Sequence, residues 1–525
     1  MQLQKLLTVT VVCGSNTVLA VNLANCFYPQ PALSLLYFSM PSANSQAAGD
    51  GTHHLYKQLA HRIGMLIEHG TLRPGDRIPS VRRVSRQERV SIATAIQAYR
   101  FLENRGLIEA RPQSGYYVRQ RTWKPPAEPE KSTPALRATR VNVGALVMRV
   151  LRATRNPELI GLGAALPSPE LLPTKQLNRC MASVGRRSEQ QSNTCDVPPG
   201  NQALRVQIAR QSMDAGCTFS PEDIVTTSGC QEALNLCLRA VARPGDTIAI
   251  ESPTYYGVLQ IIESLGMKAC EIPTFPREGV CLDELESRLK CCRIKACLFT
   301  LNFSNPLGSC MPDEKKQRLV QLLAARGIPL IEDDIYGEVA FAPRRPKTAK
   351  AFDRLGLVLL CNSFCKTLAP GYRVGWVAPG RFKTQIEHLK FVSSVGTATL
   401  PQMALADFLA NGGYDHHLRK VRRVYAEQVQ HVTQAITKYF PEGTRATRPS
   451  GGYILWVELP KKVDSLELFE RGLEAGVSIA PGPIFSAKHG FKNFVRLSCG
   501  NPWSPTIEHA LMRLGRLTHE LNRSN

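Results

Sequence analysis

From about residue 145 to the C-terminus, short strand-like runs alternate with longer helical runs. The strand-like runs include "DIVTTSG", "DTIAIES", "KACLFTL" and "PLIEDD", and the helical runs include "QEALNLCLRAVA", "YYGVLQIIESLG" and "DEKKQRLVQLLAARG". Strands that alternate with helices are typical of α/β folds, in which helices cover a mixed, mostly parallel sheet. We expect such a domain over residues 145–525, with a small C-terminal α/β lobe from roughly residue 410 onward.

A smaller region with a different pattern occupies residues 51–120. Apolar residues recur at helical spacing from Leu55 to Leu66, and the run "GTLRPGDRIPS" ends this first helix. A second helix is expected to begin near Pro79, and Ser91 is placed to cap a third. Two short strand-like runs follow around a "QSG" tip. Three helices and a hairpin in this order predict a winged helix-turn-helix.

The charge of the chain supports this interpretation. The formal net charge is +22, and residues 55–120 alone contain twelve basic residues against five acidic ones. Such an excess of base favours a polyanionic partner, most often nucleic acid. A basic soluble enzyme, or a helical bundle with a solvated face, is the alternative that charge alone leaves open.

Two further segments lack the periodicity of a packed element. Residues 121–144 are rich in proline and charge and are expected to form an extended, semi-stiff linker. The first fifty residues are too polar for a membrane-spanning helix and contain at most a weak secretory signal, so no membrane partner is expected. We expect a disordered leader there, or a misassigned start with the working protein beginning near Met40.

Sixteen cysteines are scattered through apolar runs, without a CxxC pair or a His-rich tract. In a chain of 525 residues this distribution indicates buried thiols in a reducing compartment, and therefore a cytoplasmic protein without a metal site.

The strand ends of the large domain carry most of its polar motifs. These are "TTSGCQEAL", "ESPTYYG", "NFSNPLG", "IEDDIYGE", "NSFCKTLAPGYRVG" and, far downstream, "FVRLSCG". Each is weak alone, because a lone lysine in a turn is usually a solvated surface group. Together they supply a lysine that can hold an aldehyde cofactor, a carboxylate for a ring nitrogen and groups that can bind a phosphate. Pyridoxal 5'-phosphate is the cofactor that needs this set, with Lys366 as its lysine.

The run "PGDRIPSVR" and the later run "GLIEARPQSGYYV" closely resemble the DNA-binding domain of GntR-type bacterial transcription regulators. The resemblance implies contacts with operator DNA from Arg82, Ser91, Thr94, Arg111 and Gly115. Three residues depart from the family pattern. Ile92 stands where arginine is usual, and Glu88 and Arg89 stand where leucine and glycine commonly shape the turn between the second and third helices. A β-carbon in that turn is costly if the backbone needs a positive φ.

The motifs of the large domain closely resemble, in order, those of fold-type I, class I aminotransferases. The resemblance implies that Lys366 binds the cofactor aldehyde, that Asp333 faces its ring nitrogen and that Arg496 binds a substrate carboxylate. It implies further cofactor contacts from Gly229, Cys230, Gln231, Tyr255, Asn305, Tyr336, Ser363 and Arg373. One position departs from the pattern, because Cys195 stands where many of these enzymes carry a tyrosine that reaches the cofactor phosphate of the partner subunit.

A GntR-like DNA-binding domain joined to an aminotransferase-like domain is the arrangement of the MocR subfamily of bacterial regulators. The resemblance covers residues 55 to 520 and implies a homodimer. Two functions are then open. The chain is a regulator of operator DNA whose second domain senses an amino compound or the cofactor itself, or it is an aminotransferase that acts on an amino acid.

Overall fold

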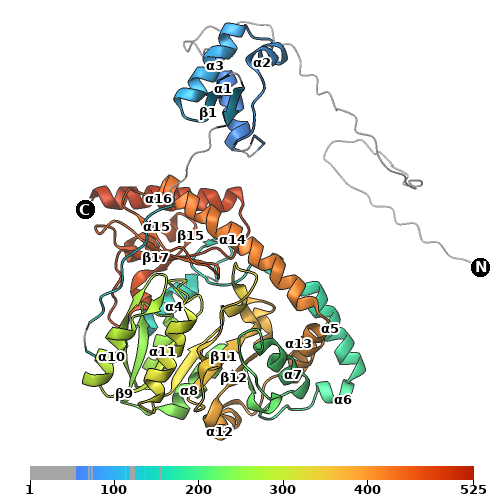
Figure 1. Cartoon of the computed structure of the whole chain (residues 1–525), viewed down its shortest axis with the longest axis vertical. Helices are drawn as coiled ribbons and strands as arrows, with labels where there is room; N and C mark the ends of the chain where they lie inside the picture. Colours follow the sequence, from blue (N-terminus) through green and yellow to red (C-terminus); the bar gives the residue numbers. More distant parts are fainter. Residues whose placement is uncertain are drawn as a thin grey trace, which may run out of the picture. The chain divides into compact units, whose positions relative to one another are not determined.

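The computed structural model describes residues 55–68, 71–72, 75–112, 114–118, 125–135, 137–153 and 155–524, and these divide into two compact units between Arg121 and Thr122 (Figure 1). The expectations of a disordered leader and of a start near Met40 concern residues outside this part of the chain. No helix of the described residues is long and apolar enough to cross a membrane.

The first unit is a three-helix domain with a two-stranded antiparallel hairpin. Its elements are α1 (Leu55–Glu68), α2 (Val81–Gln87), α3 (Ile92–Asn104), β1 (Ile108–Arg111) and β2 (Gly115–Val118). Leu59, Ala98, Tyr99 and Leu102 are among the buried residues of its core. Ser91 caps α3 as expected, since its hydroxyl accepts a hydrogen bond from the amide of Thr94 at 3.0 Å. The winged helix-turn-helix prediction is therefore confirmed.

The turn between α2 and α3 holds a non-glycine residue in a left-handed conformation. Arg89 has a φ of 51°, and Glu88 before it caps the end of α2. A side chain with a β-carbon costs about 1 kcal/mol or more in this region of φ. Glu88 also forms an ion pair with Arg62 at 2.6 Å, which links the turn to α1. Arg89, which stands where related sequences commonly have glycine, is thus the residue of this turn with a positive φ.

The second unit is built on a nine-stranded mixed sheet with the order β3-β7-β6-β9-β10-β11-β12-β5, and β8 pairs with β7. Strands β7, β6, β9, β10 and β11 run parallel to one another, whereas β12 is antiparallel to both β11 and β5. The strands are β3 (Thr139–Arg140), β5 (Val225–Thr227), β6 (Thr247–Ser252), β7 (Lys268–Phe275), β8 (Gly279–Val280), β9 (Ile294–Phe299), β10 (Leu330–Asp333), β11 (Val358–Ser363) and β12 (Gly375–Ala378).

Alternate residues of these strands enter two separate apolar cores. In β6, Ile248 and Ile250 belong to the larger core and Ala249 to the smaller one. Successive strand residues point to opposite faces of a sheet, so the two cores lie on its two faces. The larger core contains residues of α8 (Cys230–Val241) and α9 (Tyr256–Ser264), and the smaller one contains residues of α10 (Leu282–Cys291) and α11 (Asp313–Ala324). Near-continuous apolar strands covered by helices on both faces agree with the α/β prediction.

The remaining helices of the second unit are α4 (Gly144–Ala153), α5 (Thr174–Arg187), α6 (Glu189–Ser192), α7 (Gln202–Ser212), α12 (Lys383–Ser394), α13 (Thr399–Ala410), α14 (Gly413–Tyr439), α15 (Ser465–Glu474) and α16 (Pro505–Ser524). The long helix α14 leads to a C-terminal lobe with a four-stranded antiparallel sheet of order β13-β14-β17-β16 (Figure 1). Its strands are β13 (Arg445–Ala446), β14 (Ile454–Glu458), β16 (Ala480–Pro481) and β17 (Phe494–Ser498). A short parallel pair joins β4 (Ile160–Gly161) to β15 (Val477–Ser478).

Residues 125–135, which we call the strap, belong to the second unit and are bound to both of its lobes. Ser132 is buried, and its hydroxyl donates to the carbonyl of Ser252 at 2.5 Å and accepts from the amide of Thr274 at 2.9 Å. Towards its beginning the strap meets the C-terminal lobe, where Ala446 donates its amide hydrogen to the carbonyl of Ala127 at 2.9 Å. This part of the segment predicted to be an extended linker is therefore held by hydrogen bonds to the domain that follows.

Candidate cofactor site and DNA-binding surface

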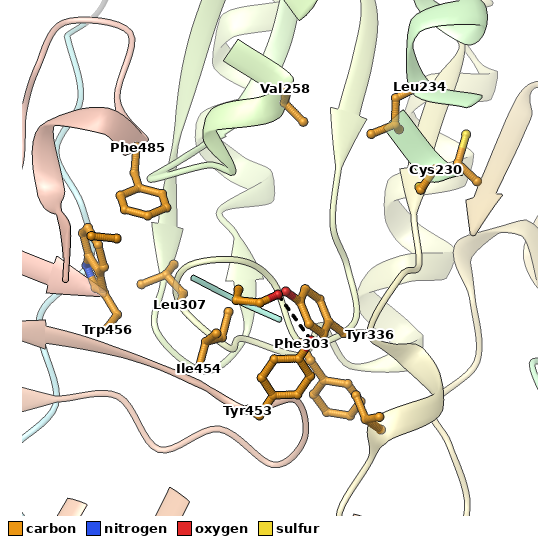
Figure 2. Packing of buried hydrophobic residues seen from close by; sticks show 14 of the residues in the cluster. Cys230, Leu234, Val258, Phe303, Leu307, Tyr336, Tyr453, Ile454, Trp456 and Phe485 are labelled. Carbon is orange, nitrogen blue, oxygen red and sulfur yellow. Dashed lines mark hydrogen bonds between the residues drawn. The ribbon is translucent and has the colours of Figure 1, made fainter. Parts of the chain in front are cut away.

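The carboxyl ends of β5, β6, β9, β10 and β11 meet at one edge of the large sheet, because these strands run in the same direction. A cavity of about 250 Å³ opens at this edge. Its lining includes eight of the ten residues predicted to contact the cofactor, namely Cys230, Gln231, Tyr255, Asn305, Asp333, Tyr336, Lys366 and Arg373. Gly229, which directly precedes Cys230, and Ser363 are outside this lining. Figure 2 shows Tyr336 beside Tyr453 among buried hydrophobic residues, with Cys230 and Leu234 on another element.

Lys366 ends a short 3₁₀ turn, Phe364–Lys366, that follows β11 directly. Its amine donates a hydrogen bond to the carbonyl of Ala165 at 2.6 Å and lies 5.6 Å from the centre of the Tyr336 ring. Burial works to lower the pKa of Lys366, but the neighbouring Tyr336 and Cys365 raise it, and the balance lies above the ordinary value for lysine. The amine is therefore protonated at neutral pH and must lose a proton before it can bond to an aldehyde.

Asp333 ends β10 and is almost completely buried. Its carboxylate accepts hydrogen bonds from the amide of Ile335 at 3.1 Å and from the thiol of Cys230 at 3.4 Å, and neither donor carries a positive charge. Burial therefore raises the pKa of Asp333 to about 6. A buried carboxylate with neutral donors is a partner for a protonated ring nitrogen.

Tyr336 and Asn305 lie on the wall of the cavity near the lysine. The hydroxyl of Tyr336 is buried and has no hydrogen-bond partner among the described residues. Asn305 accepts a hydrogen bond from Arg496 at 3.0 Å. A buried hydroxyl without a partner is costly unless a ligand satisfies it, so Tyr336 can bind a ring oxygen of a bound cofactor.

Arg496, which was predicted to bind a substrate carboxylate, comes from β17 and donates a hydrogen bond to Asn305 on the cavity wall, but is not itself part of the lining. It is completely buried, it donates to the carbonyl of Gly163 as well as to Asn305, and its Nε atom has no partner among the described residues. The side-chain oxygen of Asn305 and the carbonyl of Gly163 are both neutral. A buried guanidinium is stable only when it is paired and fully hydrogen-bonded, so a ligand carboxylate would satisfy it.

The phosphate-binding groups are arranged around the start of α8. Gly229 has a φ of 87°, and a β-carbon there would lie 2.5 Å from the guanidinium of Arg373, so a larger residue would strain the backbone and displace that guanidinium. Arg373 itself has a left-handed φ of 54° and donates to the carbonyl of Ser228 at 3.2 Å. The first amides of a helix lack intrahelical partners and attract anions. Glycine, helix amides and arginine together suit a phosphate group.

Ser363, like Gly229, is a predicted cofactor residue that does not line this cavity. Its hydroxyl caps the turn of Lys366, where it accepts from the amide of Cys365 at 3.4 Å and donates to the sulfur of Cys365 at 3.0 Å. Cys365 and Ala165 line the cavity instead, although the sequence singled out neither for a role there. Ala165 carries no functional side chain, so no chemical signal in the sequence could have identified it.

These residues fit pyridoxal 5'-phosphate. Asp333 can face the ring nitrogen, Tyr336 and Asn305 the ring oxygen, and Arg373 with the start of α8 the phosphate. When bound, this cofactor supplies an electrophilic aldehyde and an electron-accepting ring. Tyr255 also lines the cavity and can pack against such a ring. Gln231 is exposed at the rim, where its side chain donates to the carbonyl of Gly257 at 3.1 Å.

The predicted DNA contacts lie on exposed parts of the first unit. Arg82 is exposed on α2, and Ser91 and Thr94 share a hydrogen bond of 2.8 Å at the start of α3. Arg111 forms an ion pair with Glu109 at 2.9 Å and stacks on Tyr117, so part of its charge is already neutralised. Together these groups lie on the second helix, the third helix and the hairpin, which are the elements with which a winged helix-turn-helix domain contacts DNA.

Gly115 forms the exposed start of β2 with a φ of 103°. Arg77, which the sequence analysis did not single out, places its guanidinium next to Gly115, 3.5 Å from where a β-carbon would stand. The hairpin tip is therefore basic through a residue 38 positions earlier in the chain. Arg77 lies in the run "PGDRIPSVR", which resembles the GntR-type DNA-binding domain but in which Arg82 was the arginine predicted to contact DNA.

Two family profiles match the chain. "Bacterial regulatory proteins, gntR family" matches residues 55–118, and "Aminotransferase class I and II" matches residues 166–514. The chain belongs to the MocR subfamily of GntR-type regulators. It is thus a pyridoxal-phosphate-dependent, DNA-binding transcription regulator whose aminotransferase-like domain senses an amino compound or the cofactor itself.

Whole-length relatives share both domains of this regulator. The chain is 41% identical over 465 residues to the uncharacterized HTH-type transcriptional regulator YdcR of Escherichia coli, which covers 89% of this chain and 99% of the relative. It is 39% identical over 464 residues to YjiR of the same organism, with 88% and 98% covered. Among solved structures, α-aminoadipate aminotransferase LysN from Thermus thermophilus matches with a TM-score of 0.67 and 30% identity, covering 72% of this chain and 95% of that one.

Proposed function

We propose that the regulator is a cytoplasmic homodimer whose affinity for operator DNA changes when a 2-amino acid binds in the Lys366 cavity. The observation that carries this proposal is that an amine-reactive lysine occurs together with a buried arginine that has no ion-pair partner among the described residues. Lys366 holds the cofactor, and Arg496 lies behind Asn305 with only neutral acceptors. An effector with a free amino group can replace the Lys366 amine, and its carboxylate can pair with Arg496.

The strap offers a route from this cavity to the DNA-binding unit. The strap is hydrogen-bonded to Ser252 and Thr274 of the large sheet and to Ala446 of the C-terminal lobe. A movement of the C-terminal lobe relative to the large sheet would therefore change the hydrogen bonds at one end of the strap. In the sequence, the strap follows the N-terminal unit. The effect on operator affinity is limited by the difference in effector affinity between the two states, typically about 1–3 kcal/mol.

The test is a titration of the cofactor-loaded regulator with individual amino acids, with affinity for an operator duplex as the measurement. We expect one class of 2-amino acid to change operator affinity by about fivefold or more, and the corresponding amine without a carboxylate to have no such effect. An operator affinity that responds to no amino acid would contradict the proposal.

A second candidate function is supported by the completeness of the cavity. Lys366, Asp333, Asn305 and Tyr336 all line one cavity, and the chain is 32% identical over 374 residues to 2-aminoadipate transaminase of Thermus thermophilus. The same samples distinguish the two functions when a 2-keto acid is added. Many turnovers per active site would establish an aminotransferase, whereas a single exchange per site would leave sensing as the function.

The homodimer is supported by an exposed apolar patch beside the loop that carries Cys195. Val392 is 64% exposed, and Phe391 and Val395 near it are about half exposed. Gly396 packs against Asp196 and Cys195, which brings Val197, also exposed, next to these residues. A contiguous apolar patch of this kind on a soluble protein marks an association surface.

Val392→Glu is expected to shift the regulator from dimer towards monomer in analytical ultracentrifugation, because a charge would be buried in the interface without a partner. Met213→Glu is the matched control, since Met213 is equally exposed, at 65%, but lies outside the patch. An unchanged dimer for Val392→Glu would exclude the patch as the interface.

Arg82→Ala is expected to weaken operator binding and to reduce the slope of log affinity against log salt by about one unit, as for one lost phosphate contact. Arg105→Ala serves as the control, because Arg105 caps the opposite end of α3 and packs on Phe101. If both variants keep the wild-type slope while Arg82→Ala lowers stability, Arg82 has a packing role instead.

A further inference from the structure

The third helix of the N-terminal unit presents apolar side chains where a DNA-reading helix usually presents polar ones. Ile92, its first residue, is 52% exposed, and Ile96, one turn later, is 36% exposed. No residue between Ile92 and Tyr99 carries a charge. The core side of the helix is formed by Ala95, Ala98 and Tyr99 instead. The two isoleucines therefore form a solvent-facing apolar ridge along the first two turns.

The polar groups at this end of the helix are already engaged. The hydroxyl of Ser91 accepts from the amide of Thr94 and shares a second hydrogen bond with the hydroxyl of Thr94 at 2.8 Å. Both side chains thus serve the helix cap. The exposed side chains left for contacts along the first two turns are Ile92, Ala93, Ile96 and Gln97.

The surroundings of the ridge identify its occupant. Arg82, Arg83 and Arg86 are exposed on α2, Arg89 is exposed in the turn before α3, and Arg77 lies at the hairpin tip. An apolar ridge among five arginines suits a partner that is a polyanion with apolar groups inside its groove. Duplex DNA has this character, because the C5-methyl group of thymine is the apolar feature of the major groove.

We propose that Ile92 and Ile96 contact the methyl group of thymine, so that this regulator selects A·T pairs at the positions where an arginine in place of Ile92 would favour guanine. The inference rests on operator binding by the N-terminal unit. Arginine pairs with the O6 and N7 atoms of guanine, and isoleucine can make neither bond. Gln97, exposed next to Ile96, can pair with the N6 and N7 atoms of adenine.

The test begins with selection of binding sites from a random duplex library by the full-length, cofactor-loaded regulator. We expect thymine at the half-site positions that face the start of α3. Each such thymine is then replaced by deoxyuridine, which removes only the methyl group, and affinities are measured at fixed salt. The wild type should lose about fourfold in affinity for each methyl group that it contacts.

Ile92→Ala should have equal affinity for the thymine duplex and the deoxyuridine duplex at the position that Ile92 contacts. The wild type and this variant, each measured on both duplexes, form a double-mutant cycle. Ile92 is exposed at the first position of the helix, so this change leaves the core intact. Ile92→Arg should shift the selected base at that position from thymine towards guanine.

A wild type that binds both duplexes equally at every thymine of its selected site would overturn the inference while leaving operator binding intact. Selected sites with G·C pairs at the positions facing α3 would overturn it as well. If the library yields no preferred duplex, operator binding by this unit fails, and the inference fails with it.

Discussion

Lys366→Ala is expected to abolish covalent attachment of pyridoxal phosphate and to remove the response of operator binding to amino acids, while operator binding itself persists. Lys366 is the lysine in the lining of the cavity, and its amine lies next to the Tyr336 ring and the carbonyl of Ala165. No described neighbour in the lining can replace it as an amine. The measurements are the visible absorption of the purified protein and the operator affinity with and without an amino acid.

Lys366→Arg is the matched control, because it keeps a positive charge near the Ala165 carbonyl but cannot form the bond to the cofactor. We expect it to behave like Lys366→Ala in both measurements. If Lys366→Ala still responds to amino acids, then sensing does not pass through this residue. If Lys366→Ala loses operator binding but Lys366→Arg keeps it, the charge of the lysine supports the fold.

Asp333→Asn is expected to stabilise the cofactor-free regulator and to lower its affinity for the cofactor. The pKa of Asp333 is about 6 in the folded chain against an ordinary 3.8. Because the folded pKa is raised, the carboxylate costs stability as the pH rises from about 4 to about 6, and the cost above pH 6 is about 3 kcal/mol. Asparagine can still accept the hydrogen bond from Ile335 but carries no charge to bury.

The measurement is the free energy of unfolding of the cofactor-free protein between pH 4 and pH 8. The stability gap between Asp333→Asn and wild type should be absent at the lower pH and full above pH 6. With the cofactor bound, the order should reverse, because the carboxylate then has a cationic partner.

Asp353→Asn is the control, because the pKa of Asp353 is shifted in the opposite direction from that of Asp333. Burial works against the charged form of Asp353, but Lys350 and the amide of Val358 lower its pKa below the ordinary value. Its carboxylate therefore stabilises the fold at neutral pH, and this contribution is lost as the pH falls through the lowered pKa. Asp353→Asn should destabilise the protein at pH 7. Equal effects of the two substitutions would contradict the electrostatic account of Asp333.

The sequence predicted those parts of the molecule that depend on neighbours along the chain. The helical runs and strands of the large domain follow from periodicity, and the cap of α3 follows from one serine. The sequence also predicted which chemical groups the cavity contains, because its lysine, its carboxylate and its phosphate-binding groups each end or follow a strand. Parallel strands bring such ends together in any fold of this class.

The tertiary structure decided contacts whose partners are far apart in the chain. Lys366 meets the carbonyl of Ala165 across 201 positions, and Arg496 meets Asn305 across 191. The pKa of Lys366, the position of Arg496 behind the cavity wall and the hydrogen bonds of the strap all depend on such pairs. A sequence states which groups can bond or ionise, but burial and the identity of the partner set their energies, and both are properties of the packed chain.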